Sequence, residues 1–250
     1  MSVIPSVPTT TSGRLALVGS GEYLPVMQET ENWLLGDNER IYVQLATAAA
    51  PEGSTSLERW HRLGREAARR LDATQVVVDV RNREDAHDPK NVAAIASAGL
   101  VYLSGGNPTF LADTLRNTPV WDAIVAAWNG GAGLGGCSAG AMAMAGYVPH
   151  FRHPRSGGTE GLGLLPTARV LPHFDRYTRY LPDFSLRPLV TEGSVILGID
   201  EDTALVAAPP AEGNIWTFQP QGRQHAYEVT KGGSMRIDEI ALPVHTDTKS

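Results

Sequence analysis

The sequence predicts an α/β fold in which a mostly parallel sheet is flanked by helices on both faces, with an antiparallel C-terminal extension. Two observations support this fold. Short apolar segments alternate with segments of helical periodicity as far as about residue 145, which is typical of a parallel sheet covered on both sides. Beyond Gly146 the chain contains loops and closely spaced short strands instead.

Composition restricts the classes of function and location. The 250 residues carry a net charge of −6 with no long basic run, so we expect neither nucleic acid nor a membrane as a partner. The single cysteine excludes an intramolecular disulfide and fits a reducing compartment. No signal-peptide pattern and no apolar run of ~20 residues is present, so we expect a cytoplasmic protein. Residues 1–13 are expected to form a flexible tail, and residues 14–250 a single α/β hydrolase-type domain.

The first half of the chain supplies the parallel strands and their helices. Expected strands lie at 14–18, 41–48, 75–80 and 100–103, with a fifth from Gly133, and expected helices at 56–71, 91–97, 109–115 and 120–128. Glycine turns at 19–21 and 105–106 follow two of the strands. Ligands bind at the carboxyl ends of parallel strands, so these turns mark a functional edge. Glu22 at the first turn is interpreted as an acid at a helix start rather than a site residue.

The segment Gly136-Cys137-Ser138-Ala139-Gly140 has the small-residue pattern of a nucleophile elbow. Such a serine lies at a strained strand-to-helix corner, where free N–H groups of the helix start stabilise negative charge. Only Ser138 has glycine two residues away on both sides, which favours it over Cys137 as the nucleophile. The alternative is that the small residues only allow a helix to pack closely on the sheet.

The second half of the chain is expected to be loop-rich and antiparallel. A polar loop is predicted at 149–163 and a short strand at 168–171. Two strands are predicted within 195–206, joined by the acidic turn Asp200-Glu201-Asp202, and further strands near 215–218, 226–229 and 235–240.

A serine nucleophile needs a base that is itself oriented by a third group. Of the seven histidines, His173 is favoured because it directly follows a predicted strand and lies between Pro172 and Phe174. The alternative is a packed histidine at a strand end. For the third group Glu201 is the candidate from the acidic turn, against the alternative of an ordinary acidic hairpin turn.

The other histidines are less favoured. His150 and His153 form a His-x-x-His pair without an obvious third ligand, so we expect no metal site. The remaining four are interpreted as surface residues: His61, His87, His225 and His245.

Four sequence blocks occur in a specific order. They are Tyr102–Asn107, Gly136–Met142, Gly161–Pro166 with His173-Phe174, and Gly198–Leu205. In this order they resemble the serine peptidase family that includes cyanophycinase and the aspartyl dipeptidase peptidase E. The resemblance implies a flavodoxin-like fold of the class I glutamine amidotransferase type.

The resemblance also implies roles for particular residues. Ser138 would be the nucleophile, His173 the base and Glu201 the group that orients the histidine. The backbone N–H groups of Gly106 and Ala139 would form the oxyanion hole.

Several positions depart from the cyanophycinase pattern. Pro108 replaces a glutamine, Leu171-Pro172 replaces Asp-Gln, and Tyr177 and Pro182 stand where arginine is expected. These polar residues hold the aspartate–arginine polymer in the family, so the departures argue against cyanophycin as the substrate. Asn107 and Arg179 are retained and are expected to bind an acidic group of the substrate, because an arginine fork suits a carboxylate.

We therefore expect a serine-type peptidase that hydrolyses a small peptide or isopeptide, for example an aspartyl-linked one, through an acyl-enzyme on Ser138 and without a cofactor. One alternative is an amidase or esterase acting on a non-peptide acyl metabolite. Another is a catalytically silent binding homologue, against which the intact Ser138, His173 and Glu201 argue. Relatives of this kind occur as monomers and homodimers, and either state is compatible with the sequence.

Overall fold

The computed structural model describes residues 12–150, 157–178 and 189–246. Its main sheet has the strand order β14-β11-β10-β1-β5-β4-β2-β3. The five strands from β1 to β3 in this order are parallel, and β10, β11 and β14 continue the sheet in antiparallel fashion. The strands are β1 Leu15–Val18, β2 Ile41–Leu45, β3 Thr74–Val77, β4 Leu100–Leu103, β5 Gly133–Cys137, β10 Thr203–Ala207, β11 Ile215–Gly222 and β14 Ile240–Pro243.

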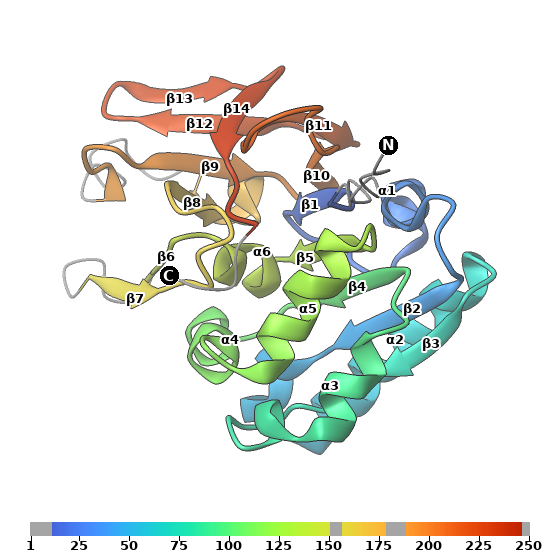
Figure 1. Cartoon of the computed structure of the whole chain (residues 1–250). Helices are drawn as coiled ribbons and strands as arrows, with labels where there is room; N and C mark the ends of the chain where they lie inside the picture. Colours follow the sequence, from blue (N-terminus) through green and yellow to red (C-terminus); the bar gives the residue numbers. More distant parts are fainter. Residues whose placement is uncertain (1–11, 151–156, 179–188, 247–250) are drawn as a thin grey trace, which may run out of the picture.

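Helices connect the parallel strands and pack on both faces of the sheet. The α-helices are α1 Gln28–Leu35, α2 Ser54–Arg70, α3 Pro89–Ile95, α4 Pro108–Leu115, α5 Pro119–Asn129 and α6 Ala139–Met144. Short 3-10 turns lie at η1 Pro25–Met27, η2 Thr47–Glu52 and η3 Asp85–His87. Helices α3 and α5 lie side by side across the front of the sheet in Figure 1.

The alternation of side chains along the strands produces two cores. Leu17 of β1 and Leu103 of β4 pack in one core with residues of α3, α4 and α5. Their neighbours Val18 and Tyr102 point to the opposite face, into a second core with residues of α1 and α2. Because successive side chains of a strand face opposite sides, a strand buried on both faces is apolar throughout.

Three helices begin with the same local signal. The side chains of Asp88, Asn107 and Thr118 each accept a hydrogen bond from a backbone N–H of the first turn of α3, α4 or α5. In each case proline follows directly, and proline fits the first helical position because its missing N–H has no partner there.

A second sheet packs beside the first and has the order β13-β12-β9-β8. Its strands β8 and β9 are parallel and the other pairs are antiparallel. The strands are β8 Ala168–Leu171, β9 Val195–Ile199, β12 Ala226–Thr230 and β13 Gly233–Arg236. A two-stranded hairpin, β6 Tyr147–Pro149 with β7 Gly158–Glu160, lies in part of the segment expected to be loop.

The fold class predicted from the sequence is confirmed: a mostly parallel sheet, helices on both faces and antiparallel C-terminal strands. The acidic turn at 200–202 differs from an ordinary hairpin, because β9 belongs to the second sheet and β10 to the first. The strand expected at 235–240 is two strands, β13 and β14, in different sheets.

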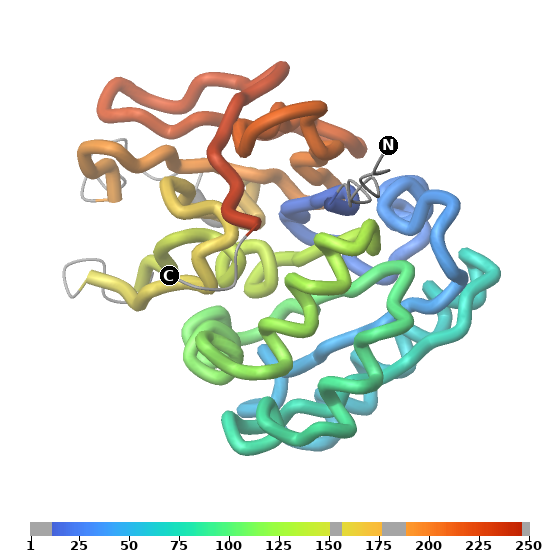
Figure 2. Tube along the Cα trace, in the orientation of Figure 1, coloured from blue at the N-terminus to red at the C-terminus, as the bar shows by residue number. Residues whose placement is uncertain are grey.

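Beyond β14 the chain returns to the centre of the molecule (Figure 2). The N–H of His245 donates to the carbonyl of Leu164, at 2.8 Å. Among the helices described here, none has the length and hydropathy that crossing a bilayer requires.

Candidate active site

Three side chains predicted from the sequence meet just beyond the carboxyl ends of three strands. Ser138 follows β5 of the first sheet, and His173 and Glu201 follow β8 and β9 of the second. Ser138 Oγ lies 3.0 Å from His173 Nε2, and His173 Nδ1 lies 2.9 Å from Glu201 Oε1. The three side chains therefore form a continuous hydrogen-bonded chain across the junction of the two sheets.

Ser138 occupies a strained corner between β5 and α6. Its backbone has φ 49° and ψ −107°, a conformation that costs a non-glycine residue on the order of 1–3 kcal/mol. The corner needs small neighbours. A methyl group on Gly140 would lie 2.3 Å from the carbonyl oxygen of Leu103, and one on Gly136 would lie 2.7 Å from the carbonyl carbon of Gly140. The predicted strand-to-helix turn with serine at its tip is present.

His173 is positioned by the pairing of β8 with β9. These strands run parallel, with Leu171 opposite Gly198, so the residues that follow them leave the sheet together. The buried ring of Phe174 packs on β9 where Gly198 has no side chain, since a methyl group there would lie 2.6 Å from the ring. Phe174 thus anchors the residue next to it, and the backbone of His173 turns into the site with φ 50°.

Glu201 is held from several directions. Its Oε2 is 2.7 Å from Nε of Arg176, and its N–H donates to Asp175 Oδ1 at 2.9 Å. Arg176 and Asp175 both lie in the single π-helical turn Phe174–Thr178 that follows His173. This turn therefore fixes the carboxylate that contacts the imidazole, and neither residue was identified from the sequence.

Two backbone N–H groups, one in the loop after β4 and one at the start of α6, are available as donors. In the loop after β4 the N–H groups of Ser104, Gly105 and Asn107 donate to partners inside the protein. The N–H of Gly106 has no hydrogen-bond partner among the described residues, and this glycine is exposed. Ala139 is the first residue of α6, so its N–H lacks an intrahelical acceptor.

Gly106 also needs to be glycine. Its φ is +137°, and a methyl group would lie 2.4 Å from the carbonyl oxygen of Ala48. The loop can approach the η2 turn this closely only without a side chain.

Cys137, the other candidate nucleophile, faces away from the site. Its side chain is fully buried, and its thiol donates to Glu22 Oε2 at 2.8 Å. Burial, and after it the neighbouring Glu22 carboxylate, raise the pKa of this thiol well above its ordinary value. The choice of Ser138 over Cys137 agrees with this geometry.

The interpretation of Glu22 as an acid at a helix start is wrong. The side chain is 7% exposed and lies between the loop after β4 and the end of β5, where its Oε1 accepts the N–H of Gly105 at 3.0 Å. The following helical turn begins only at Pro25. The sequence signal that could have identified it is its place beyond a buried strand and a Gly-Ser-Gly turn.

The remaining predicted residues lie as follows. Asn107 caps α4, with its side-chain oxygen accepting the Phe110 N–H at 3.0 Å, and Pro108 is the first residue of that helix. Leu171 is fully buried and Pro172 is half-buried.

Arg179, expected to bind an acidic group, lies outside the described residues, as do Pro182 and His153. The part of the chain that the structure describes contains no group of three or more side chains suited to a metal ion.

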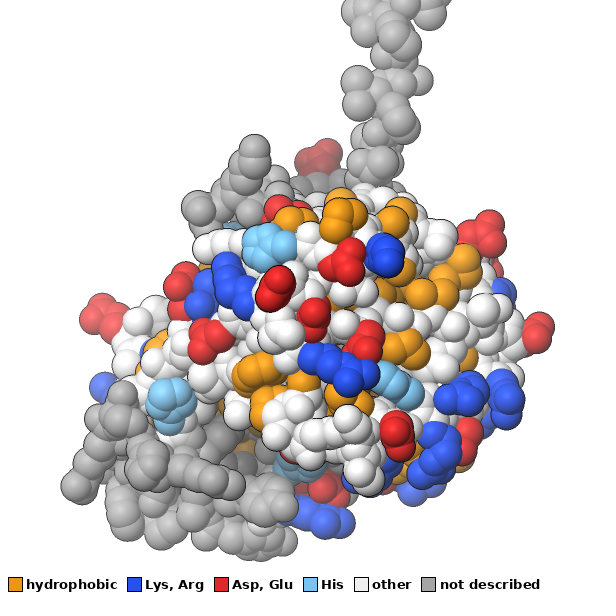
Figure 3. Space-filling model, turned by 90° about the horizontal axis from the view of Figure 1, so that it is seen from below, with side chains coloured by type: hydrophobic (Ala, Val, Ile, Leu, Met, Phe, Trp, Pro, Cys, Tyr) orange, Lys and Arg blue, Asp and Glu red, His pale blue; other side chains and the backbone are white. Residues whose placement is uncertain are grey.

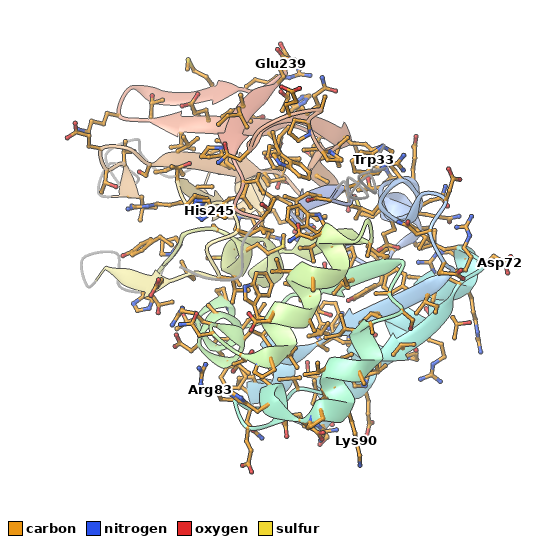
Figure 4. The ribbon with its side chains drawn as sticks, viewed as in Figure 1. Trp33, Asp72, Arg83, Lys90, Glu239 and His245 are labelled. Carbon is orange, nitrogen blue, oxygen red and sulfur yellow. The ribbon has the colours of Figure 1, made fainter. Side chains whose placement is uncertain are left out.

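The periphery of the molecule carries charge of both signs. Asp72, Arg83, Lys90 and Glu239 lie at the periphery and point outward in Figure 4. Seen from below, acidic, basic and apolar side chains are interspersed over the coloured part of the surface (Figure 3). A continuous basic surface of the kind that binds nucleic acid is not visible on that face.

Comparison with known proteins agrees with this architecture. Residues 51–209, which include Ser138, His173 and Glu201, match the model of peptidase family S51. The cyanophycinases of Nostoc sp. and Trichormus variabilis are each 28% identical to the chain in an alignment 226 positions long, which covers 82% of this chain and 72% of each relative.

Two solved structures are similar as well. A peptidase from an acI-B1 actinobacterium has a TM-score of 0.83 at 37% identity, covering 93% of this chain and 98% of that one. A protein from Listeria monocytogenes described as a putative peptidase E shares the fold, with a TM-score of 0.59 at 16% identity, over 85% of this chain and all of that one. The chain belongs to peptidase family S51.

Proposed function

We propose that this protein is a serine-type peptidase that hydrolyses a small peptide or isopeptide through an acyl-enzyme on Ser138. The observation that carries the proposal is the hydrogen-bonded chain from Ser138 Oγ through His173 to Glu201, with distances of 3.0 Å and 2.9 Å. A hydroxyl becomes nucleophilic only with a base in such reach, and the base needs a third group to orient it. Membership of a peptidase family supports the same reaction class.

The first half of the reaction follows from this geometry. His173 Nε2 takes the proton as Ser138 Oγ attacks the carbonyl carbon. Glu201 holds the other ring nitrogen and stabilises the imidazolium. The N–H groups of Gly106 and Ala139 donate to the oxyanion, and each such donor is typically worth about 3 kcal/mol. The imidazolium then gives its proton to the leaving amine as the tetrahedral intermediate collapses to the acyl-enzyme.

The second half repeats these steps with water. His173 takes a proton from a water molecule as the oxygen of that water attacks the acyl carbon. The same two N–H groups bind the second oxyanion. Return of the proton to Ser138 Oγ releases the acid. No step of the proposed cycle requires a cofactor.

The substrate we propose has an aspartyl residue at the cleaved bond. Similarity to cyanophycinases supports this class. The departures at Pro108, Leu171 and Pro172 favour a short peptide over the polymer, because a capped helix start and a buried leucine replace the polar groups expected there.

The experiment is hydrolysis of a panel of α- and β-aspartyl dipeptides, followed by mass spectrometry. Wild type is expected to cleave at least one member, and Ser138→Ala to lose ~10⁴-fold or more in rate. Ser97→Ala, an exposed serine at the amino end of β4, is the matched control and should retain full activity. If wild type cleaves no member, the aspartyl preference is wrong. Equal cleavage by wild type and Ser138→Ala would exclude Ser138 as the nucleophile.

A further inference from the structure

Glu22 is a buried carboxylate that the catalytic chain described above does not use. It follows β1 and is 7% exposed. Its two oxygens accept from two different segments: Oε1 from the N–H of Gly105 at 3.0 Å, and Oε2 from the thiol of Cys137 at 2.8 Å. A buried carboxylate is costly unless hydrogen bonds satisfy it, so this arrangement is a specific feature of the fold.

The two donors lie one residue before Gly106 and two residues before Ala139, the two halves of the proposed oxyanion hole. Gly105 is followed by Gly106, and Cys137 is followed by Ser138 and Ala139. The three groups are in close approach, because a methyl group on Gly105 would lie 2.7 Å from Glu22 Oε1 and 3.5 Å from Ser138 Cβ. One carboxylate therefore joins the loop after β4 to the strained corner after β5.

The bond to Gly105 determines which N–H of the β4 loop is free. Ser104 and Asn107 donate to backbone carbonyls of Leu45 and Ala48, and Gly105 donates to Glu22. Within the described residues this leaves Gly106 as the member of the loop with an unused N–H. Without Glu22, Gly105 would be a second unsatisfied donor and the loop could rotate to another arrangement.

The bond to Cys137 acts on the corner itself. The thiol stays protonated because its pKa is raised, so it is a donor to the carboxylate. Ser138 N–H donates to the carbonyl of Val18 at 2.9 Å, so both backbone and side chain of this corner are tied to the β1 segment.

Glu22 is in turn held by its neighbour Tyr23. The Tyr23 N–H donates to Glu31 Oε1 at 2.9 Å, and its hydroxyl is 2.6 Å from Ser104 Oγ. Arg70 donates to the Tyr23 carbonyl. The segment that presents Glu22 is thus fixed to α1, α2 and the β4 loop together.

We propose that Glu22 is a positioning residue that sets the spacing between the Gly106 and Ala139 N–H groups and Ser138 Oγ. This role rests on the proposed serine mechanism. Glu22 acts only through Gly105 and Cys137, and a displacement of catalytic groups by about 1 Å costs on the order of 10²-fold in rate.

The first test uses Glu22→Gln with an alkyl fluorophosphonate probe and with the peptide that wild type cleaves. The probe reacts when Ser138 Oγ bonds to phosphorus, fluoride leaves, and His173 takes the proton. The phosphoryl oxygen then occupies the oxyanion hole. In this variant an NH2 group replaces one carboxylate oxygen, so one of the two donors faces another donor and loses its acceptor. Labelling and kcat should therefore fall about 10- to 100-fold with KM within about 2-fold. Glu58→Gln, on the exposed face of α2, is the control and should match wild type.

The second test addresses the same link from the thiol side and does not change the buried charge. Cys137→Ala removes the donor and should slow labelling about 10-fold. Cys137→Ser keeps a donor and should recover most of that loss, a rescue that a purely structural role of the thiol would not give. Thermal unfolding of each variant measures the folded fraction.

The outcomes separate the two proposals. Labelling of Glu22→Gln at the wild-type rate, or a loss no larger than the loss of folded protein, would overturn the role of Glu22 and leave the serine mechanism intact. Equal rates for Cys137→Ala and Cys137→Ser would overturn the link through the thiol. Failure of wild type to react with the probe and with every peptide would overturn the proposed function itself.

Discussion

At the scale of single residues, Ser138 is held in a backbone conformation that favours glycine. Its φ of 49° and ψ of −107° lift the hydroxyl toward His173 at the cost of strain. Because an L side chain causes the strain, replacing serine by glycine should relieve it, whereas replacing it by alanine should not.

The first prediction compares Ser138→Gly with Ser138→Ala, which both lack the hydroxyl. The glycine variant should be more stable than the alanine variant by about 1 kcal/mol, because alanine at positive φ stays strained. Denaturant unfolding measures the difference, and both variants should be inactive. Equal or lower stability of the glycine variant would mean that the corner stores no strain.

Glu31 is a buried acid of α1 from which we expect a pH dependence of stability. It is 1% exposed, and burial, more than any neighbouring charge, raises its pKa from 4.5 to about 7. Since folding raises this pKa, the folded protein holds the proton more tightly than the unfolded chain does. The protonated side chain therefore adds to the free energy of unfolding. This contribution is fully present below pH 4.5 and is lost as the pH rises to about 7.

The second prediction follows for Glu31→Gln, which keeps an acceptor for the Tyr23 N–H. Between about pH 5 and about pH 8 wild type should lose on the order of 2–3 kcal/mol of stability that the variant does not lose. Thermal unfolding at the two pH values measures this difference. Glu29→Gln, exposed on the same helix, should behave as wild type. A parallel pH profile for Glu31→Gln and wild type would contradict the prediction.

At the scale of elements, the pairing of β8 with β9 controls where His173 and Glu201 emerge. The two strands run parallel in register, and each catalytic candidate lies two residues beyond its strand: Leu171 to His173 and Ile199 to Glu201. The buried Phe174 ring against Gly198 fixes the turn that follows β8.

The third prediction is that Gly198→Ala damages catalysis through this contact. A methyl group 2.6 Å from the Phe174 ring must displace the ring and, with it, the adjacent His173. We expect kcat to fall on the order of 10²-fold and stability to fall by about 1–3 kcal/mol. Gly232→Ala, with 3.8 Å of clearance in the turn between β12 and β13, is the control. Normal activity of Gly198→Ala would show that Phe174 does not position the base.

At the scale of the whole molecule, the site is shared between two sheets. Ser138, the proposed nucleophile, comes from the first sheet, and His173 and Glu201, the proposed base and its orienting carboxylate, come from the second. The chain crosses between the sheets at residues 200–202, directly beside the site. We therefore expect that packing at the opposite edge can be changed without affecting the site.

The fourth prediction uses Trp216 of β11, which packs on Trp128 of α5 with ring centroids 5.2 Å apart. Trp128 precedes β5, so this pair lies at the amino edge, away from Ser138. Trp216→Ala should lower the free energy of unfolding by about 3–5 kcal/mol because it opens a cavity in the core. The exposed neighbour variant Ile215→Ala should cost far less. Urea unfolding measures the stability of both variants. The kcat per folded molecule should stay unchanged in each. A loss of kcat would mean that packing at the amino edge is coupled to the site at the carboxyl edge.

The sequence was sufficient to predict the parallel part of the sheet and the residues that meet at its carboxyl edge. Apolar strands such as Leu100–Leu103 are buried on both faces, so their composition identifies them, and glycine spacing distinguished Ser138 from Cys137. Helix α1 escaped prediction because its sequence, Gln28–Leu35, has only a weak apolar face.

Other features depend on contacts between distant segments. The residues of the turn Asp200-Glu201-Asp202 do not indicate that β9 and β10 belong to different sheets. The role of Glu22 is set by groups that follow β4 and β5, far along the chain. The single-domain boundary, the roles of the site residues and the monomer or homodimer state stay predictions.

The burial of Cys137 also bears on how the protein responds to oxidants. Peroxide and electrophiles attack thiolates that solvent can reach. The single sulfhydryl of this chain is enclosed and protonated, although it is the immediate neighbour of Ser138, the proposed nucleophile. An enzyme with a cysteine nucleophile at this corner would be inactivated when the thiolate is oxidised to sulfenic acid. With the Ser138 oxygen at the tip and the Cys137 sulfur buried behind it, we expect the proposed chemistry of this site not to depend on the redox state of its surroundings.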